Sequence, residues 1–221
     1  MLKDKGTMTP DGGTESRLLE AAGEIFAEYG YRAATIRQIC EKAGANIAAV
    51  NYHFRDKDGL YRAVLRFVHE AYVKKYPPLL ASNSGATAEQ RLRSYVQGLL
   101  RRLFEEGRPS WHMKLMAREM IEPTRAFDML VEEAARPLHE ELTSIVREIL
   151  GPKASDFTVR VCTLSILSQG VYYHRARPVI RRLYPRQQYG PKEIEALVEH
   201  ITQFSLLALN GMAKKIHAES R

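Results

Sequence analysis

Cysteine, tryptophan and long apolar runs are scarce in this chain of 221 residues, which contains two cysteines and one tryptophan. Cys40 and Cys162 belong to no CxxC motif or Cys/His cluster, so we expect neither a disulfide nor a metal site and place both thiols among buried hydrophobic groups. No apolar run approaches the roughly 18 residues of a membrane span. Residues 1–6 also lack the apolar core of a signal peptide. We therefore expect a cytoplasmic protein with no membrane partner.

Catalytic signatures are also missing from the sequence. None of the seven histidines has the Glu-x-x-His spacing of di-iron helical bundles, and the run from His139 to Thr143 lacks the second histidine of a zincin. P-loop, GxGxxG and GxSxG motifs do not occur. We expect no catalytic residue, no bound metal, no cofactor and a protein that is not an enzyme.

Sustained period-two alternation, the pattern of β-strands, does not occur, whereas apolar residues recur at helical spacing and predict an all-α fold. We expect a disordered arm over residues 1–13, a helix-turn-helix domain over 14–60 and a second helical domain over 61–221. The expected helices run from about Thr14 to Gly30, Thr35 to Gly44, Asn46 to Phe54, Asp56 to Pro77, Thr87 to Glu106, Trp111 to Ile121, Pro123 to Leu150 with a kink or a break at Pro137, Ser155 to Leu183, and Pro191 to Lys215.

Two short helices joined by a turn lie at the centre of the N-terminal region. Thr35 is a good N-cap for a first short helix, which Gly44 should end in the left-handed conformation. Asn46 offers a second N-cap, and Val50 and Phe54 follow at helical spacing. This arrangement is a helix-turn-helix, whose second helix enters the DNA major groove.

An ordinary helical hairpin would show the same spacing, so the outward residues of the second helix decide between the two interpretations. No carboxylate occurs from Asn46 to Arg55, and small side chains stand beside hydrogen-bonding ones. A face that approaches an anionic groove needs small residues and neutral or cationic donors. This composition favours DNA binding over a merely solvated face.

The formal net charge of +7 indicates an anionic partner, but the charge is unevenly distributed. Residues 1–60 hold eight Lys or Arg against nine Asp or Glu, whereas 31–62 hold six against three. The densest basic segment lies elsewhere, between residues 171 and 190, which contain no acidic residue; its arginines are Arg175, Arg177, Arg181, Arg182 and Arg186. They are either functional or solvated charge near a helix C-terminus.

The stretch from Thr35 to Lys57, followed by Gly59-Leu60-Tyr61, resembles the TetR/AcrR family of transcriptional repressors over about residues 14–65. The helix lengths, Gly44, the Tyr52-His53-Phe54 run and Lys57 carry this resemblance. It implies a DNA-binding head on a helical ligand-binding domain, with a homodimer formed through the last two helices.

The resemblance also implies which residues contact DNA. By it, Thr35, Tyr52, His53 and Lys57 are phosphate contacts, and Arg37, Ala48, Ala49 and Asn51 face bases or the groove wall. The sequence departs from many members at Asn51, where an aromatic residue is common, and at Ala49, where a hydroxyl residue is common. Asn51 suits an adenine edge. Ile47 either faces a thymine methyl group or lies half-buried against the first helix.

The run from Trp111 to Met120 and the run from Tyr172 to Pro178 resemble a subgroup represented by CecR-type regulators. In this region we expect adaptable and polar side chains to line a ligand pocket, although for any single apolar residue core packing is the favoured explanation. These candidate ligand-binding residues are Trp111, Met116, Met120, Phe127, Tyr172 and His174.

The sequence as a whole predicts a ligand-responsive DNA-binding transcriptional regulator, a repressor released from a pseudo-palindromic double-stranded operator by a small-molecule effector. The alternative is a helical module that binds small molecules or proteins and has no DNA function.

Overall fold

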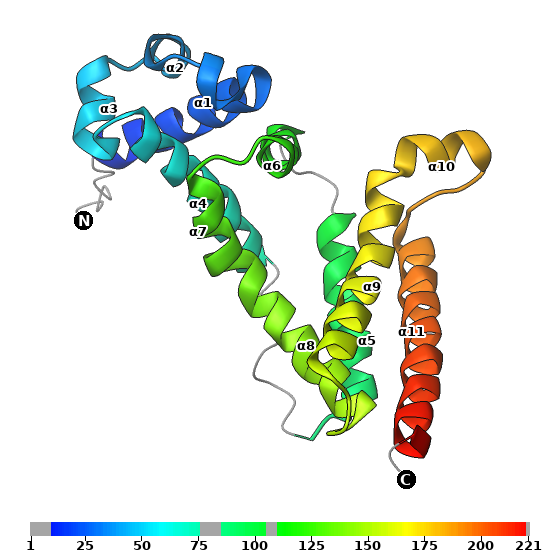
Figure 1. Ribbon diagram of the computed structural model, residues 1–221. Coiled ribbons are helices and arrows are strands. Elements are labelled where there is room, and N and C mark those ends of the chain that lie inside the picture. The colour runs from blue at the N-terminus through cyan, green and yellow to red at the C-terminus, as the bar shows by residue number, and fades with distance from the viewer. Residues whose placement is uncertain (1–9, 76–84, 105–109, 220–221) are drawn as a thin grey trace, which may run out of the picture. The chain divides into compact units, whose positions relative to one another are not determined.

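The computed structural model describes residues 10–75, 85–104 and 110–219, and over these ranges the regular structure is entirely helical, which confirms the all-α prediction (Figure 1). Within the same ranges, no helix combines the length and the apolar character that crossing a membrane would require. The elements are α1 (Pro10–Ala33), α2 (Ile36–Ala43), α3 (Ile47–Phe54), α4 (Lys57–Lys75), α5 (Ala88–Leu103), α6 (Ser110–Ile121), α7 (Ala126–Leu130), η1 (Val131–Ala135), α8 (Arg136–Leu150), α9 (Asp156–Arg175), α10 (Arg177–Leu183) and α11 (Pro191–Glu219).

The first helix begins earlier than its sequence predicts. Because α1 starts at Pro10, residues 10–13 are helical, and the expectation of a disordered arm is wrong for them. Proline is tolerated at a first helical position, where its missing N–H has no intrahelical partner to lose. The rest of the expected arm, the Pro77-Pro78 stop and Ser82 to Ser84 of the expected linker lie outside the described residues. At Gly30 the backbone leaves helical geometry, with φ 78° and ψ 164°.

Two of the expected long helices are interrupted. The helix expected from Pro123 to Leu150 becomes α7, the π-helical turn η1 and α8, with Pro137 in the first turn of α8. This confirms the break expected near that proline. The helix expected from Ser155 to Leu183 is wrong as one element: it divides at Ala176 into α9 and α10, because Pro178 restricts the residue before it and supplies no N–H.

The helices form two compact units that do not follow the order of the chain. One unit contains residues 1–74 and 107–134, and the other contains 75–106 and 135–221. This division differs from a boundary after residue 60, because α4, α6 and α7 contribute buried residues to the same core as α1, α2 and α3. We call these the head unit and the body unit.

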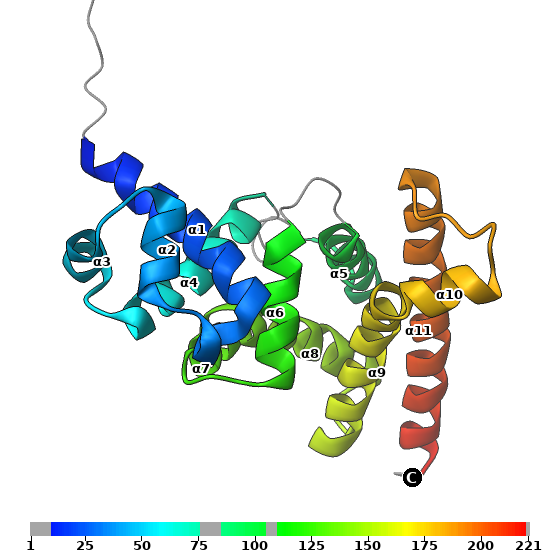
Figure 2. The same ribbon diagram turned by 90° about the horizontal axis from the view of Figure 1, so that it is seen from above.

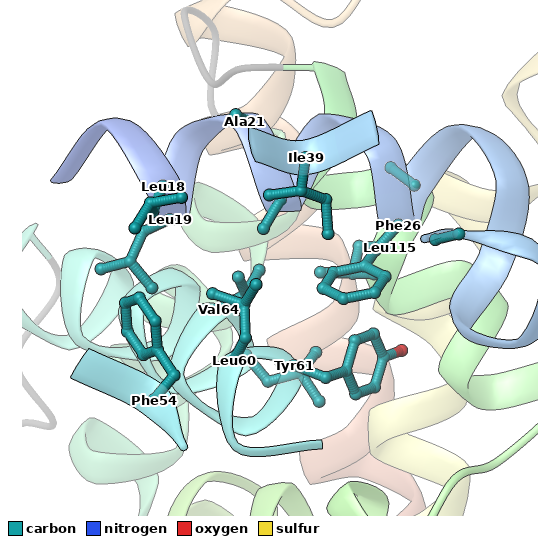
Figure 3. Packing of buried hydrophobic residues seen from close by; sticks show 14 of the residues in the cluster. Leu18, Leu19, Ala21, Phe26, Ile39, Phe54, Leu60, Tyr61, Val64 and Leu115 are labelled. Atoms are coloured by element: carbon teal, nitrogen blue, oxygen red, sulfur yellow. The ribbon is translucent and has the colours of Figure 1, made fainter. Parts of the chain in front are cut away.

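In the head unit, α6 packs along α1 and is held there by side-chain and backbone contacts. Figure 3 shows Phe26, Ile39 and Leu115 of α6 among the buried side chains of one core. The Arg118 guanidinium donates to the carbonyl oxygens of Ala27 at 2.9 Å and Glu28 at 2.8 Å, just before the helix breaks at Gly30. A segment distant in the sequence therefore fixes the end of α1.

A buried hydrogen bond joins α4 to α6 in the same unit. The Tyr61 hydroxyl donates to Glu119 Oε1, and both side chains are almost completely buried. The Thr124 amide and hydroxyl each donate to Glu119 Oε2 at 3.2 Å, so both carboxylate oxygens are satisfied. Burial, reinforced by the hydrogen bond to Glu119, raises the pKa of Tyr61 far above its ordinary value.

The body unit is built around α5, α8, α9 and α11. Leu92, Leu100, Leu142 and Val198 are completely buried in its core. Cys162 is buried there and Cys40 is buried in the head unit, as the sequence predicts, and both are free thiols.

We predict that Gly23→Ala lowers the free energy of unfolding by about 1–3 kcal/mol, the usual cost of overpacking a core. A Cβ at Gly23 would lie 2.2 Å from the Trp111 ring, and that ring is buried and has little room to move. Urea denaturation measures the change. Gly13→Ala, in the same helix with open space around its Cβ, is the control and should not destabilise the protein. Equal stability of the two variants would contradict this account of the α1–α6 contact.

Candidate nucleic-acid interface

The first helix of the motif has well-defined caps at both ends. Thr35 Oγ1 accepts from the Gln38 amide at 3.3 Å, and the Thr35 amide donates to Gln38 Oε1 at 2.9 Å, which completes a capping box. Gly44 ends α2 in the left-handed conformation at φ 59° and ψ 40°. The Arg17 side chain also donates to the Ala43 carbonyl at 3.3 Å. These contacts fix the turn between α2 and α3.

The second helix, α3, is capped by Asn46, whose Oδ1 accepts from the Ala49 amide at 2.8 Å. Val50 and Phe54 are buried and attach this helix to the core of the head unit. Figure 2 shows α2 and α3 beside α1, and the three helices contact one another in pairs. The expected helix-turn-helix is therefore formed from rigid elements.

The opposite face of α3 is open and contains no acidic side chain. Ala48 and Asn51 are exposed, and Tyr52 has 74% of its surface accessible. Ile47 is 53% exposed, so of its two expected orientations the structure shows the outward one. Such a face offers donors and apolar contacts to an anionic groove without charge repulsion.

Two of the residues implied by the resemblance are less accessible. Ala49 is half-buried against the core. His53 is also half-buried, with its ring 4.9 Å from the Tyr52 ring in an edge-on arrangement. This contact helps to hold the phenol of Tyr52 in one orientation.

The cations of the candidate interface already make contacts within the protein. Arg37 is highly exposed on α2, with Nε 3.0 Å from Glu41 Oε1. An exposed ion pair of this kind stabilises a helix by only about 0.3–0.5 kcal/mol, so a phosphate or a base can replace Glu41 as the partner of Arg37. Lys57 Nζ donates to the Arg32 carbonyl at 3.2 Å and lies 4.8 Å from the centre of the Tyr31 ring. Partial burial lowers the pKa of Lys57.

Arg55 is a candidate that the resemblance does not supply. It follows α3 directly, is exposed, and adopts φ 72° and ψ −52°, the only positive φ of a non-glycine residue within the described ranges. Residues held in such a conformation store strain and concentrate at functional sites. The sequence shows its charge, but only the structure shows its backbone conformation.

The candidate ligand-binding residues are divided between the two units. Trp111 is buried in the head-unit core, where Met116 and Phe127 also pack, and Met120 is 63% exposed on α6. In the body unit, Tyr172 lines a groove and the His174 ring lies 5.9 Å from that of Phe104. Neither unit by itself brings the whole set together. No cluster of possible metal ligands occurs among the described residues.

Two family models match this chain, one in its N-terminal part and one in its C-terminal part. Residues 18–64 match the model of the bacterial regulatory proteins of the TetR family. Residues 88–209 match the C-terminal domain of the HTH-type transcriptional dual regulator CecR. The chain belongs to the TetR family. It is a DNA-binding transcriptional regulator with a helix-turn-helix in its N-terminal part and a CecR-like C-terminal domain.

Relatives of this TetR-family regulator include the dual regulator CecR of Shigella flexneri, which is 25% identical over 209 residues covering 91% of this chain and 93% of CecR. The transcriptional repressor Rv1474c of Mycobacterium tuberculosis is 44% identical over 50 residues, 23% of this chain and 27% of that protein. A TetR-family crystal structure from Rhodococcus RHA1 shares the fold with a TM-score of 0.62 at 19% identity, over 89% of this chain and 96% of that one.

We predict that Gly44→Ala destabilises this TetR-family regulator by about 1 kcal/mol, because a side chain disfavours the left-handed conformation. The site is otherwise open, with nothing within 4 Å of an added Cβ, so conformation alone sets the cost. Gly44→Asn is the matched control, since asparagine tolerates this conformation better. Thermal unfolding compares them, and an Asn variant less stable than the Ala variant would contradict the explanation.

Proposed function

We propose that this regulator is a homodimeric repressor that leaves a pseudo-palindromic operator when a small molecule binds it. The observation that carries the proposal is the exposed, acid-free face of α3 on a helix held by its cap and by buried Val50 and Phe54. Rigid presentation of such a face is what major-groove reading requires. One relative, Rv1474c, is named a repressor and is similar over 23% of this chain, and CecR, similar over 91%, is named a dual regulator. We place the protein in the cytoplasm, where DNA is accessible.

In this proposal, Thr35, Tyr52, His53 and Lys57 anchor phosphates. The Thr35 side chain is used in the capping box, so its contribution is to orient the first amides of α2 toward a phosphate. Lys57 keeps donors free after its bond to the Arg32 carbonyl, since an ammonium group has three. We add exposed Arg55 to this group.

We assign base and groove-wall contacts to Arg37, Ala48, Ala49 and Asn51. Arg37 and Asn51 supply hydrogen-bonding groups, and the two alanines allow close approach. The outward side chain of Ile47 suits a thymine methyl group.

The homodimer is supported by exposed apolar side chains on the last two long helices. Phe157 and Leu164 on α9 are 66% and 51% exposed, and Phe204 and Leu207 on α11 are 58% and 74% exposed. A second copy would cover them in a four-helix interface. Two recognition helices related by the same two-fold axis would then read half-sites about 34 Å apart.

For release, the effector must bind the DNA-incompetent arrangement more tightly than the competent one. We propose that α4 acts as the lever, because it starts next to α3 and runs to the boundary of the head unit. The boundary between Ala134 and Ala135 falls inside η1. π-helical turns within helices are frequent at functional sites, so we take η1 as a second candidate for the moving element.

Leu207→Glu should convert the dimer to a monomer, because it would bury an unpaired carboxylate in the apolar interface. Light scattering of the full-length protein measures the mass. Ile121→Glu, which changes a residue that is 77% exposed in the head unit, is the control and should remain dimeric. A dimeric Leu207→Glu protein would contradict the use of this face.

Arg37→Ala and Tyr52→Ala should each weaken operator binding about tenfold without unfolding the protein, because each removes one contact to DNA worth about 1–3 kcal/mol. Footprinting locates the operator, and mobility-shift titration measures the loss in affinity.

The controls for this experiment are Arg66→Ala and Tyr29→Ala. Arg66 of α4 pairs with Glu133 of η1, and Tyr29 lies on α1, where it is 51% exposed. Neither residue belongs to the α2–α3 face. Both should bind the operator as the unmodified protein does. Equal losses in the test and control variants would contradict the residue assignments, and an absence of any footprint would favour a helical binding module without DNA function.

A further inference from the structure

Tyr31 lies in the last turn of α1, just after the backbone leaves helical geometry. The break is at Gly30, with φ 78° and ψ 164°, and the Ala34 amide then donates to the Gly30 carbonyl at 3.1 Å. In this closed turn Tyr31 is half-buried against the head-unit core, whereas Arg32 is exposed. Tyr31 is not one of the proposed DNA contacts, yet its ring lies beside one of them, Lys57.

The ammonium group of Lys57 is held by two neutral groups of this turn. Nζ donates to the Arg32 carbonyl at 3.2 Å and lies 4.8 Å from the centre of the Tyr31 ring. A ring at this distance attracts a cation through its quadrupole. Because a carbonyl and a ring carry no net charge, they orient the ammonium group without cancelling its charge. At least one of its three N–H donors remains for a phosphate.

The two carboxylates nearest to Lys57 in the sequence have other partners. Asp56 Oδ1 accepts from the Gly59 amide at 2.7 Å, at the start of α4. The Asp58 carboxylate pairs with Arg62 at 2.5 Å. Neither carboxylate therefore competes strongly with a phosphate for the ammonium group.

The Tyr31 ring is itself fixed by an aromatic cluster of the head unit. Its centre is 4.8 Å from that of the Tyr61 ring and 6.2 Å from that of the Phe26 ring. The Phe26 and Tyr61 rings meet edge to face at 4.7 Å, and Figure 3 shows both in the core. The Tyr61 hydroxyl is anchored in turn by its hydrogen bond to Glu119. These neighbours restrict the orientation of the ring that contacts Lys57.

The ionisation of the two side chains suits a phosphate contact. Burial, reinforced by the carboxylates of Asp58 and Asp56, raises the pKa of Tyr31 above its ordinary value, so the phenol is uncharged at neutral pH and does not repel a phosphate. Burial lowers the pKa of Lys57. A carbonyl and an aromatic ring both favour the charged form of an amine, so they oppose this effect of burial.

We propose that Tyr31 is a positioning residue of the DNA interface, whose ring holds the Lys57 ammonium group in the orientation that meets a DNA phosphate. This inference rests on the phosphate contact proposed for Lys57. A free lysine side chain loses rotamer entropy when it binds, and one already held by a ring and a carbonyl loses less. Tyr31 acts through Lys57 and does not itself contact DNA.

A double-mutant cycle tests this role by mobility-shift titration of the intact protein with its operator. Lys57→Gln should weaken operator binding about tenfold, because it removes a charged hydrogen bond to a phosphate. Tyr31→Leu should weaken it about threefold, the effect expected of one cation–π contact. Tyr31→Phe keeps the ring and should bind as the unmodified protein does. Combined with Lys57→Gln, the Tyr31→Leu change should cause no further loss.

Tyr29→Leu is the matched control, because Tyr29 is 51% exposed two residues earlier and should not affect operator binding. If Tyr31→Leu costs the same affinity with and without Lys57, or if Tyr31→Phe costs as much as Tyr31→Leu, the ring only stabilises the core and the positioning role is overturned. The phosphate contact of Lys57 would then stand. Normal operator binding by Lys57→Gln would overturn that contact and this inference together, and leave the rest of the proposed function in place.

A nuclear magnetic resonance measurement without DNA checks the contact itself. The ring current of Tyr31 should shift the ε-methylene protons of Lys57 upfield. Tyr31→Phe should keep this shift, Tyr31→Leu should remove it, and Tyr29→Leu should leave it unchanged. Absence of the shift in the unmodified protein would overturn the inference even where operator binding is normal. If Tyr31→Leu does not fold, the shift in the unmodified protein and in Tyr31→Phe still decides. A protein that shows the shift but protects no DNA would overturn the proposed function, and the positioning role with it.

Discussion

The packing of α6 against α1 and α4 is the constraint on which the DNA-binding head depends. The Trp111 ring occupies the space left by Gly23, Arg118 binds the carbonyls at the end of α1, and Tyr61 shares a buried hydrogen bond with Glu119. An unsatisfied buried carboxylate would be costly, so the hydrogen bonds of Glu119 restrict the positions that α4 and α6 can adopt together. A head formed from distant parts of the chain is connected to the body unit by several chain segments.

Helix α3 combines a backbone that is fixed at its ends with an outer face of small or neutral side chains. Its caps and its buried Val50 and Phe54 fix the backbone, while the outer face has small or neutral side chains and Arg55 at its end. The exposed ion pair of Arg37 with Glu41 contributes little stability, so DNA can compete for this guanidinium at small cost. In the proposed interface, specificity would depend on a few side chains, chiefly Arg37, Asn51 and Ile47.

The basic segment around α10 gives the body unit a chemical character that its net charge does not reveal. Glu195 and Glu199 of α11 pair with Arg93, whereas residues 171–190 contain five arginines and no acidic residue. The guanidinium of Arg177 makes cation–π contacts with the rings of Phe104 and Tyr189, and these contacts stabilise its charge.

The local sequence determined the elements whose signals act over short distances. Thr35, Gly44 and Asn46 set the limits of α2 and α3, and the absence of acids from Asn46 to Arg55 indicated the DNA-facing surface, because caps, turns and helical periodicity depend on neighbouring residues. The resemblance supplied the family and the candidate contacts, and the family is confirmed.

Only the tertiary structure decided which helices share a core and which candidate residues are accessible. It placed Trp111, Met116 and Phe127 in the head unit, showed Ile47 pointing outward, divided the expected helix at Ala176, and joined Tyr172 with Phe204 in a groove. An apolar residue at helical spacing has the same sequence signature in a core, an interface or a ligand site. Its role depends on contacts with residues far away in the chain, and folding alone establishes those contacts.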